Sequence, residues 1–216
     1  LNIIGVGIGF YLSNAIGEKK DYSHYFIFIA ALLYIYSTYL KRIVIISNVV
    51  VASVLSVSVL ILGVFDLFPA IYEGNKAQMQ QAFSVLFDYA VFAFIINLIR
   101  EIVKDIQDTD GDYSSGIQTI PIILGKTGTS KLLSALILVS ILLLLYYLNN
   151  NLLDYKYVFQ YGLLFIVGPL LYVMIKLWSA KTKEEFKHVS TVLKLVLFFG
   201  ILSIAVITYA IKNAQR

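Results

Sequence analysis

Cysteine is absent from this sequence of 216 residues, and charged side chains make up only 14 % of it. Without cysteine the chain can form neither a disulfide framework nor a cysteine-based metal or nucleophile site. Soluble domains carry about 25 % charged residues, so this chain has too few charges to coat a water-soluble globule. The composition therefore excludes a disordered chain, a secreted disulfide scaffold and a nucleic-acid-binding module.

Hydrophobic residues are instead abundant, at 59 % of the chain, and the mean hydropathy is +0.82. A helix needs roughly 20 apolar residues to cross a bilayer. Seven segments approach or exceed that length, namely 1–16, 24–40, 43–65, 82–103, 131–148, 157–178 and 189–211. They are too long for buried strands, and barrel strands would alternate polar and apolar residues. We therefore expect an all-α fold, a polytopic transmembrane helix bundle that forms a single domain over residues 1–216 and contacts membrane lipids.

Lysine and arginine predict how this bundle is oriented, because cytoplasmic loops are enriched in both. The side that holds the polar stretch after residue 103 carries ten of these residues and the opposite side carries six. We therefore expect a multi-pass protein with that stretch in the cytoplasm, in the plasma membrane if the source is prokaryotic. The net charge of +4 is ordinary for such a protein and needs no nucleic acid as a partner.

Acidic residues gather at the end of the fourth segment. Five of the thirteen in the chain lie there, against a single lysine: Glu101, Asp105, Asp108, Asp110 and Asp112. If the helix continues past residue 103, Asp105, Asp108 and Asp112 fall at i, i+3 and i+7, on one face. Three carboxylates there repel one another unless a cation neutralises them. Their hard oxygens suit Mg²⁺ that is shared with substrate phosphates.

Two basic residues, Arg100 and Lys104, lie one turn apart beside these carboxylates and are suited to hold phosphate oxygens. The simpler interpretation is a solvated acidic loop, as most charge runs are. A calcium loop of the EF-hand type fits poorly, because Tyr113 and Thr119 stand where that loop needs Gly and Glu.

The charged run 181–188 is also expected to be a solvated loop, with contact to anionic lipid as the alternative.

The acidic stretch also carries a resemblance. The second aspartate-rich motif of the UbiA superfamily of intramembrane prenyltransferases is similar to Lys104-Asp105-x-x-Asp108-x-x-Gly111-Asp112, which Gly116-x-x-Thr119-x-Pro121 follows. The geranylgeranylglycerol-phosphate geranylgeranyltransferase branch looks most similar, because it also resembles Tyr36-Ser37-x-x-Leu40-Lys41-Arg42 with Asn48 after it. The homogentisate branch has a similar acidic stretch, so an aromatic acceptor is the alternative.

The resemblance implies transfer of a prenyl group, geranylgeranyl in this branch, from an allylic diphosphate to a lipophilic acceptor such as a prenylglycerol phosphate. It implies that Asp105, Asp108 and Asp112 are the catalytic residues that hold Mg²⁺ against the diphosphate. It also implies substrate-binding roles for Lys104, Arg100, Lys41, Tyr36, Ser37 and Asn48. Simpler interpretations are an interfacial belt for Tyr36 and Ser37, a positive-inside anchor for Lys41 and interhelical contact for Asn48.

Members of the superfamily have nine helices and a first aspartate-rich motif of the type NDxxDxxxD, which this sequence does not contain. We therefore expect a chain that lacks the first two helices with that motif and is inactive without them.

Two other functional classes are possible for a membrane protein of this kind. A transporter would place acidic residues at mid-membrane, whereas the acidic residues here concentrate at one membrane face. A non-catalytic membrane scaffold would bind no prenyl diphosphate. The oligomeric state stays open.

Overall fold

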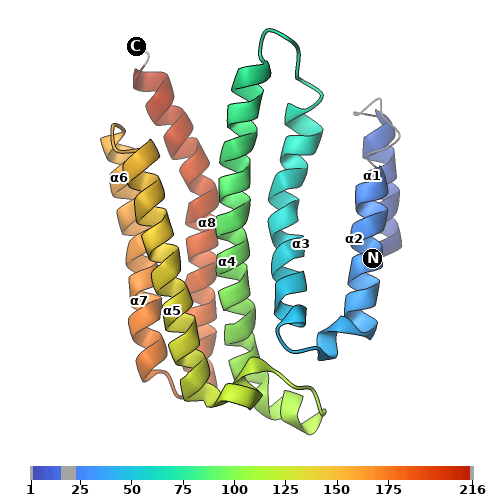
Figure 1. Cartoon of the computed structure of the whole chain (residues 1–216), viewed down its shortest axis with the longest axis vertical. Coiled ribbons are helices and arrows are strands. Elements are labelled where there is room, and N and C mark those ends of the chain that lie inside the picture. Colours follow the sequence, from blue (N-terminus) through green and yellow to red (C-terminus); the bar gives the residue numbers. More distant parts are fainter. Residues whose placement is uncertain (1, 16–22, 215–216) are drawn as a thin grey trace. The chain divides into compact units, whose positions relative to one another are not determined.

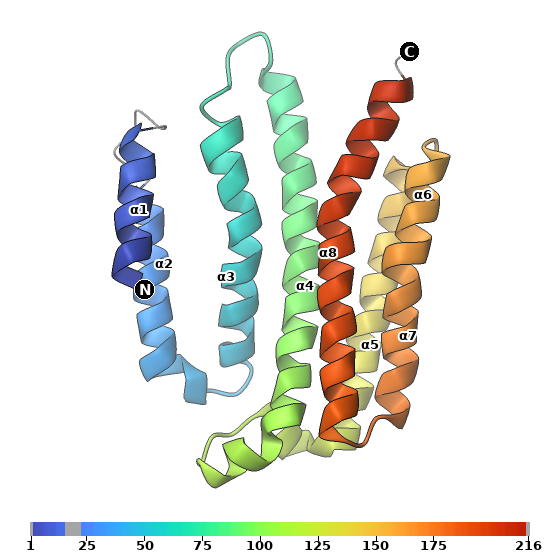
Figure 2. The same cartoon turned by 180° about the vertical axis from the view of Figure 1, so that it is seen from behind.

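The computed structural model describes residues 2–15 and 23–214, and within these ranges every regular element is a helix (Figures 1 and 2). In chain order the elements are α1 (Asn2–Ala15), α2 (Ser23–Thr38), η2 (Leu40–Arg42), α3 (Ile46–Leu62), η3 (Gly63–Leu67), α4 (Lys76–Ser114), α5 (Ile120–Asn151), α6 (Lys156–Gly162), η4 (Leu163–Val167), α7 (Gly168–Ser179) and α8 (Lys183–Ala214). The α6, η4 and α7 elements follow one another without a break and form one segment. The prediction of an all-α fold with helices over the seven apolar stretches is confirmed.

Two helices extend well beyond the apolar stretches from which they were predicted. The α4 helix continues past residue 103 to Ser114, and α5 begins at Ile120 rather than near residue 131, so only residues 115–119 separate them. Extending an existing helix adds one backbone hydrogen bond for each residue that becomes ordered, whereas starting a new helix is unfavourable. The acidic run is therefore the end of a helix and not a loop.

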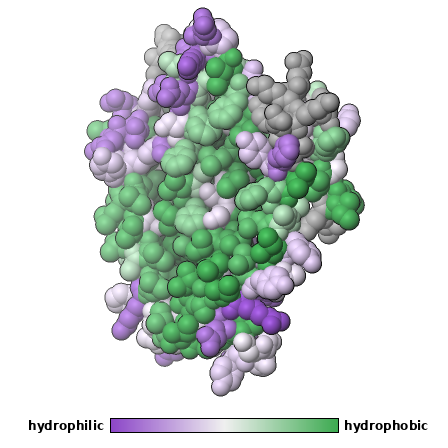
Figure 3. All heavy atoms as spheres, turned by 45° about the vertical axis from the view of Figure 1, so that its right-hand side comes forward, coloured by the Kyte–Doolittle hydropathy of each residue, from purple (hydrophilic) through white to green (hydrophobic). Residues whose placement is uncertain are grey.

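Five helical segments of the described chain are long and apolar enough to cross a membrane: Ile46–Leu67, Lys76–Ser114, Ile120–Asn151, Lys156–Ser179 and Lys183–Ala210. The apolar helix His24–Thr38 is shorter. Large apolar side chains of these segments point outward, as Leu142, Ile175 and Ile201 do with 58 %, 69 % and 64 % of their surface exposed. Figure 3 shows hydrophobic side chains over much of the surface in that view. The protein is therefore an integral membrane protein whose outer surface contacts lipid.

Contacts within the chain divide it into two units, Leu1–Val91 and Phe92–Arg216. In the first unit α1 packs on α2. Gly9 allows this packing, because a Cβ atom at that position would overlap the ring of Phe26. The Ser56 hydroxyl donates a hydrogen bond of 2.7 Å to the carbonyl of Ala90 and ties α3 to the first half of α4. Small residues and polar contacts of this kind hold helices together in lipid, where burial of apolar surface gives little driving force.

The second unit is a bundle built from the second half of α4 with α5, the α6–α7 segment and α8. Its buried side chains recur every three or four residues on each helix: Ile96, Ile99, Val103 and Ile106 on α4; Leu133, Ile137 and Ile141 on α5; Leu170, Val173 and Leu177 on α7; Phe186, Val189, Leu193 and Val196 on α8. The Trp178 ring N–H donates a 2.8 Å hydrogen bond to the Ser134 hydroxyl and joins α7 to α5. Figures 1 and 2 show α8 alongside α4, so the ends of these two helices can present charged residues to one another.

Candidate functional site

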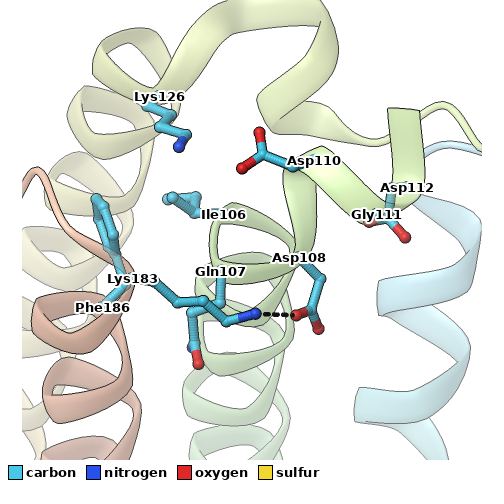
Figure 4. Close-up of a pocket in the computed structure, with 9 residues that line it drawn as sticks. All are labelled: Ile106, Gln107, Asp108, Asp110, Gly111, Asp112, Lys126, Lys183 and Phe186. Atoms are coloured by element: carbon cyan, nitrogen blue, oxygen red, sulfur yellow. Dashed lines mark hydrogen bonds and ion pairs between the residues drawn. The ribbon is translucent and has the colours of Figure 1, made fainter. Parts of the chain in front are cut away.

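A pocket of about 320 Å³ lies at the C-terminal end of α4, within the second unit. Its lining combines three carboxylates from α4, namely Asp108, Asp110 and Asp112, with Lys126 from α5 and Lys183 from α8. The apolar side chains of Ile106 and Phe186 line it as well, and both are buried. Figure 4 shows these side chains entering the pocket from three different helices. The pocket is therefore the place where the acidic motif meets lysines that are distant in sequence.

The end of α4 distributes its carboxylates around the pocket. In Figures 1 and 2 the last turns of the helix bend away from the axis of its long upper part. Figure 4 shows Asp110 pointing toward the side from which Lys126 enters, while Asp108 faces Lys183 and Asp112 points away from both. Asp108 and Asp110 are exposed and Asp112 is half-buried. The pocket thus offers carboxylate oxygens in several directions.

The three aspartates of the predicted metal site are only partly brought together. Asp108 and Asp112 line the pocket, but Asp105 does not. Over residues 2–15 and 23–214, no group of three or more His, Cys, Asp or Glu side chains comes close enough to hold a metal ion by itself. The spacing i, i+3 and i+7 puts these side chains on one helix face, but positions i and i+7 are two turns and about 10 Å apart along the axis. The metal-binding role of Asp105, Asp108 and Asp112 stays a prediction.

Lys126 follows a break in α5. Gly125 has φ of 69° and ψ of 163°, which is not helical, and it separates the short first part of α5 from the rest of that helix. This backbone region is essentially restricted to glycine, because a Cβ atom would clash there. The change of direction at Gly125 therefore sets where Lys126 enters the pocket.

Lys183 lies in the first turn of α8, where several hydrogen bonds fix the backbone. The Glu185 carboxylate accepts the backbone N–H of Thr182 at 3.1 Å, and the Thr182 hydroxyl accepts the backbone N–H of Glu185 at 3.3 Å. This reciprocal pair is a capping box, which satisfies N–H groups at the start of a helix. Glu185 also pairs with Lys176 of α7 at 2.8 Å. The side chain of Lys183 reaches from this fixed turn to Asp108, with 3.3 Å between Nζ and Oδ1.

The two predicted phosphate-binding residues of α4 bind a different partner. Arg100 and Lys104 both pair with the Glu101 carboxylate, at 3.4 Å in the case of Arg100 Nη1. Neither lines the pocket. Arg100 Nε is buried, and the described residues offer it no hydrogen-bond partner. The Glu101 carboxylate thus neutralises part of the positive charge that was predicted to face phosphate oxygens, and the roles of both residues stay predictions.

The remaining predicted residues belong to the first unit, so the structure describes them separately from the pocket. Tyr36 is half-buried in α2, and the Ser37 hydroxyl donates a 2.9 Å hydrogen bond to the carbonyl of Tyr34. Lys41 is exposed in the short helix η2. Asn48 is only 4 % exposed and accepts a hydrogen bond from the Ser47 hydroxyl at 3.4 Å. Their substrate-binding roles stay predictions.

Three charged pocket residues are not among the predicted site residues, namely Asp110, Lys126 and Lys183. Asp110 belongs to the acidic run, but the spacing used there selects positions on one helix face. Lys126 directly follows Gly125, and the isolated glycine was the available signal for a helix break. Lys183 lies in a charged run whose composition predicts a solvated loop, and no sequence pattern links it to Asp108, which is 75 positions away in the chain.

Comparison with known proteins identifies the family of this chain. Residues 22–202 match the family described as the UbiA prenyltransferase family. The chain belongs to this family. Its membership confirms the resemblance that the acidic motif suggested.

Several similar curated proteins carry the same name. Digeranylgeranylglyceryl phosphate synthase of Thermococcus gammatolerans is 37 % identical over 94 residues, which cover 44 % of this chain and 29 % of that protein. The synthase of Methanosphaera stadtmanae is 30 % identical over 118 residues, 53 % of this chain and 41 % of that protein. The synthase of Pyrococcus abyssi is 54 % identical over 37 residues, 17 % of this chain and 13 % of that protein. The chain thus covers less than half the length of these relatives. No solved structure matches it.

Proposed function

We propose that this UbiA-family protein transfers a geranylgeranyl group from its diphosphate to a prenylglycerol phosphate within the membrane. The observation that carries the proposal is the pocket at the end of α4, where the carboxylates Asp108, Asp110 and Asp112 share a lining with Lys126 and Lys183. A diphosphate is recognised by groups of both kinds, since a divalent ion bridges carboxylates to phosphate oxygens and ammonium groups bind those oxygens directly. The names of the similar synthases support the choice of acceptor.

The carboxylates of the pocket fit a divalent metal ion, which enzymes of this family generally use. Mg²⁺ prefers oxygen ligands and is usually bound through one or two carboxylates together with substrate phosphates and water. Asp108 and Asp112 would supply the carboxylate oxygens. When bound there, the ion would neutralise charge on the departing diphosphate. A site that the substrate completes needs no group of three protein ligands.

The other residues of the pocket would assist the departure of the diphosphate. Lys126 and Lys183 would place positive charge where negative charge grows as the allylic C–O bond breaks, which stabilises the transition state. The apolar helices would exclude water from the allylic cation, because water would otherwise capture it before the acceptor does. Ile106 and Phe186 provide apolar lining at the inner part of the pocket. The isoprenoid tail would lie among the apolar helices.

The orientation also belongs to this proposal. The lysine and arginine bias supports a cytoplasmic position for the end of α4. The diphosphate head group and Mg²⁺ would then meet the pocket on the cytoplasmic side, while the prenyl tail and the lipophilic acceptor would lie in the bilayer.

A turnover assay tests the function. The full-length protein, purified in lipid nanodiscs with Mg²⁺, is given labelled geranylgeranyl diphosphate and either geranylgeranylglyceryl phosphate or homogentisate. We expect product with the glycerol phosphate acceptor. Product with homogentisate alone would favour the aromatic branch of the superfamily, and absence of product with both acceptors would reject the proposal.

Metal-site variants test the mechanism in the same assay. We expect Asp108→Asn and Asp112→Asn each to lower turnover by about a hundredfold or more, because each removes charge that holds the ion at the developing negative charge. Asp88→Asn is the matched control, since Asp88 is an exposed residue of the same helix that lies outside the pocket. Normal turnover in both site variants would reject the assignment of the metal ligands.

A further inference from the structure

Lys183 neutralises Asp108, a carboxylate that the proposed function assigns to a metal ion. The two charged atoms lie 3.3 Å apart, and both side chains are well exposed, at 66 % and 65 %. An exposed ion pair contributes little to stability because water screens it. A competing cation or anion therefore opens the pair easily. Asp108 can then bind a cation while Lys183 binds an anion.

The position of Lys183 is fixed even though its ammonium group is exposed. Its backbone lies in the turn that Thr182 and Glu185 cap, and Glu185 also holds Lys176 and the backbone N–H of Lys181. Three residues further on, Phe186 is 1 % exposed and anchors the same turn in the bundle. The backbone of Lys183 is thus fixed, and only the end of its side chain can move from one partner to another within the pocket.

We propose that Lys183 exchanges its partner when substrate binds, leaving Asp108 to the metal ion and taking a diphosphate oxygen. This inference rests on the proposed function and adds a substrate-binding residue to the same pocket. A divalent ion held by Asp108 would repel the lysine ammonium group, and the oxygens of a diphosphate in the same pocket would offer Lys183 a new partner. The exchange keeps charge balanced in both states, because Lys183 faces a carboxylate without substrate and a phosphate with it.

The exchange predicts different effects on the binding of two ligands, pyrophosphate and Mn²⁺. Each is measured separately by titration calorimetry in nanodiscs of neutral lipid. Lys183→Met should weaken binding of inorganic pyrophosphate in saturating Mg²⁺ by about tenfold, because a charge-assisted hydrogen bond is lost. The same variant should bind Mn²⁺ alone as tightly as the wild type or more tightly, because the competing cation has been removed. Lys183→Arg keeps the charge and should restore most of the pyrophosphate affinity.

The matched control is Lys187→Met, one turn further along α8. Lys187 is similarly exposed, pairs with Glu184 at 4.0 Å and does not line the pocket. It should leave both affinities unchanged. Equal pyrophosphate affinities in Lys183→Met and Lys187→Met would overturn the inference, and so would a loss of both Mn²⁺ and pyrophosphate binding in Lys183→Met, which would indicate a structural role. An effect confined to nanodiscs that contain phosphatidylglycerol would assign Lys183 to lipid headgroups instead and would also overturn it.

These binding data remain separate from the turnover assay. Weakened pyrophosphate binding in Lys183→Met without prenyl transfer by the wild type would support the exchange and reject the proposed acceptor chemistry. Normal prenyl transfer together with no effect of Lys183→Met would do the reverse. A wild-type protein that binds no pyrophosphate in Mg²⁺ would reject both.

Discussion

Single residues determine which charged side chains line the pocket at the end of α4 and from which side each one reaches it. The acidic run was visible in the sequence because five carboxylates within twelve residues are unusual in a chain with 14 % charged residues. The partners of these carboxylates were not visible. Lys126 and Lys183 come from other helices, and their approach depends on backbone geometry at Gly125 and at the start of α8. Charge content could thus be predicted, whereas charge pairing could not.

Gly125 gives a prediction at this scale. Replacement by alanine should destabilise the protein by about 1–3 kcal/mol, because a side chain is strained at φ of 69° and ψ of 163°. The variant should also weaken pyrophosphate binding, since Lys126 follows directly. Thermal unfolding and calorimetry in nanodiscs measure the two effects.

Gly7→Ala is the control for this substitution. Gly7 lies in α1 with open space around the position of a Cβ atom. Alanine favours the helical state over glycine, so this variant should be neutral or slightly stabilising. If Gly125→Ala proved as stable as Gly7→Ala, the break in α5 would not depend on glycine.

Helix ends are the elements that build the site. The end of α4 supplies the carboxylates, the start of α5 supplies Lys126 and the start of α8 supplies Lys183. The apolar stretches predicted the middle of each helix well, because hydropathy reports which residues are apolar enough to lie in lipid. They did not predict that α4 continues to Ser114 or that α5 begins at Ile120. Polar residues can extend a helix beyond the membrane without any apolar signal.

The cap of α8 gives a prediction at the scale of elements. Thr182→Ala removes the hydroxyl that accepts the Glu185 N–H and should destabilise the protein by about 1 kcal/mol. It should also lower pyrophosphate affinity by loosening the turn that holds Lys183. Both effects are measured by thermal unfolding and by calorimetry with Mg²⁺-pyrophosphate.

Thr191→Ala serves as the control in the same helix. Thr191 is exposed two turns later, and its hydroxyl donates a hydrogen bond to the carbonyl of Lys187 within the helix. Alanine is a good helix former, so we expect no loss of stability or affinity. Equal behaviour of Thr182→Ala and Thr191→Ala would argue against a positioning role for the cap.

For the whole molecule, the absence of cysteine makes the orientation directly testable. A single cysteine can be introduced as Ser115→Cys, just beyond α4, or as Asn150→Cys, at the far end of α5. In right-side-out vesicles a membrane-impermeant maleimide should label only the Asn150 variant, and in inside-out vesicles only the Ser115 variant. The reverse pattern would place the pocket outside the cytoplasm, and labelling of both variants from one side would contradict a membrane-spanning α5.

The sequence alone determined the class of the protein, because the free energy of placing a residue in lipid depends mainly on side-chain chemistry and segment length. It also determined the family, since the acidic motif is contiguous and can be read without any structure. The contacts of Arg100 and Lys104 with Glu101 lie within α4 and are local to the sequence. Only the tertiary structure decided that Asp108 pairs with Lys183 and that Lys126 shares its pocket. Those neighbours come from different helices, so they depend on distances between atoms of packed helices, which hydropathy and motif spacing do not contain.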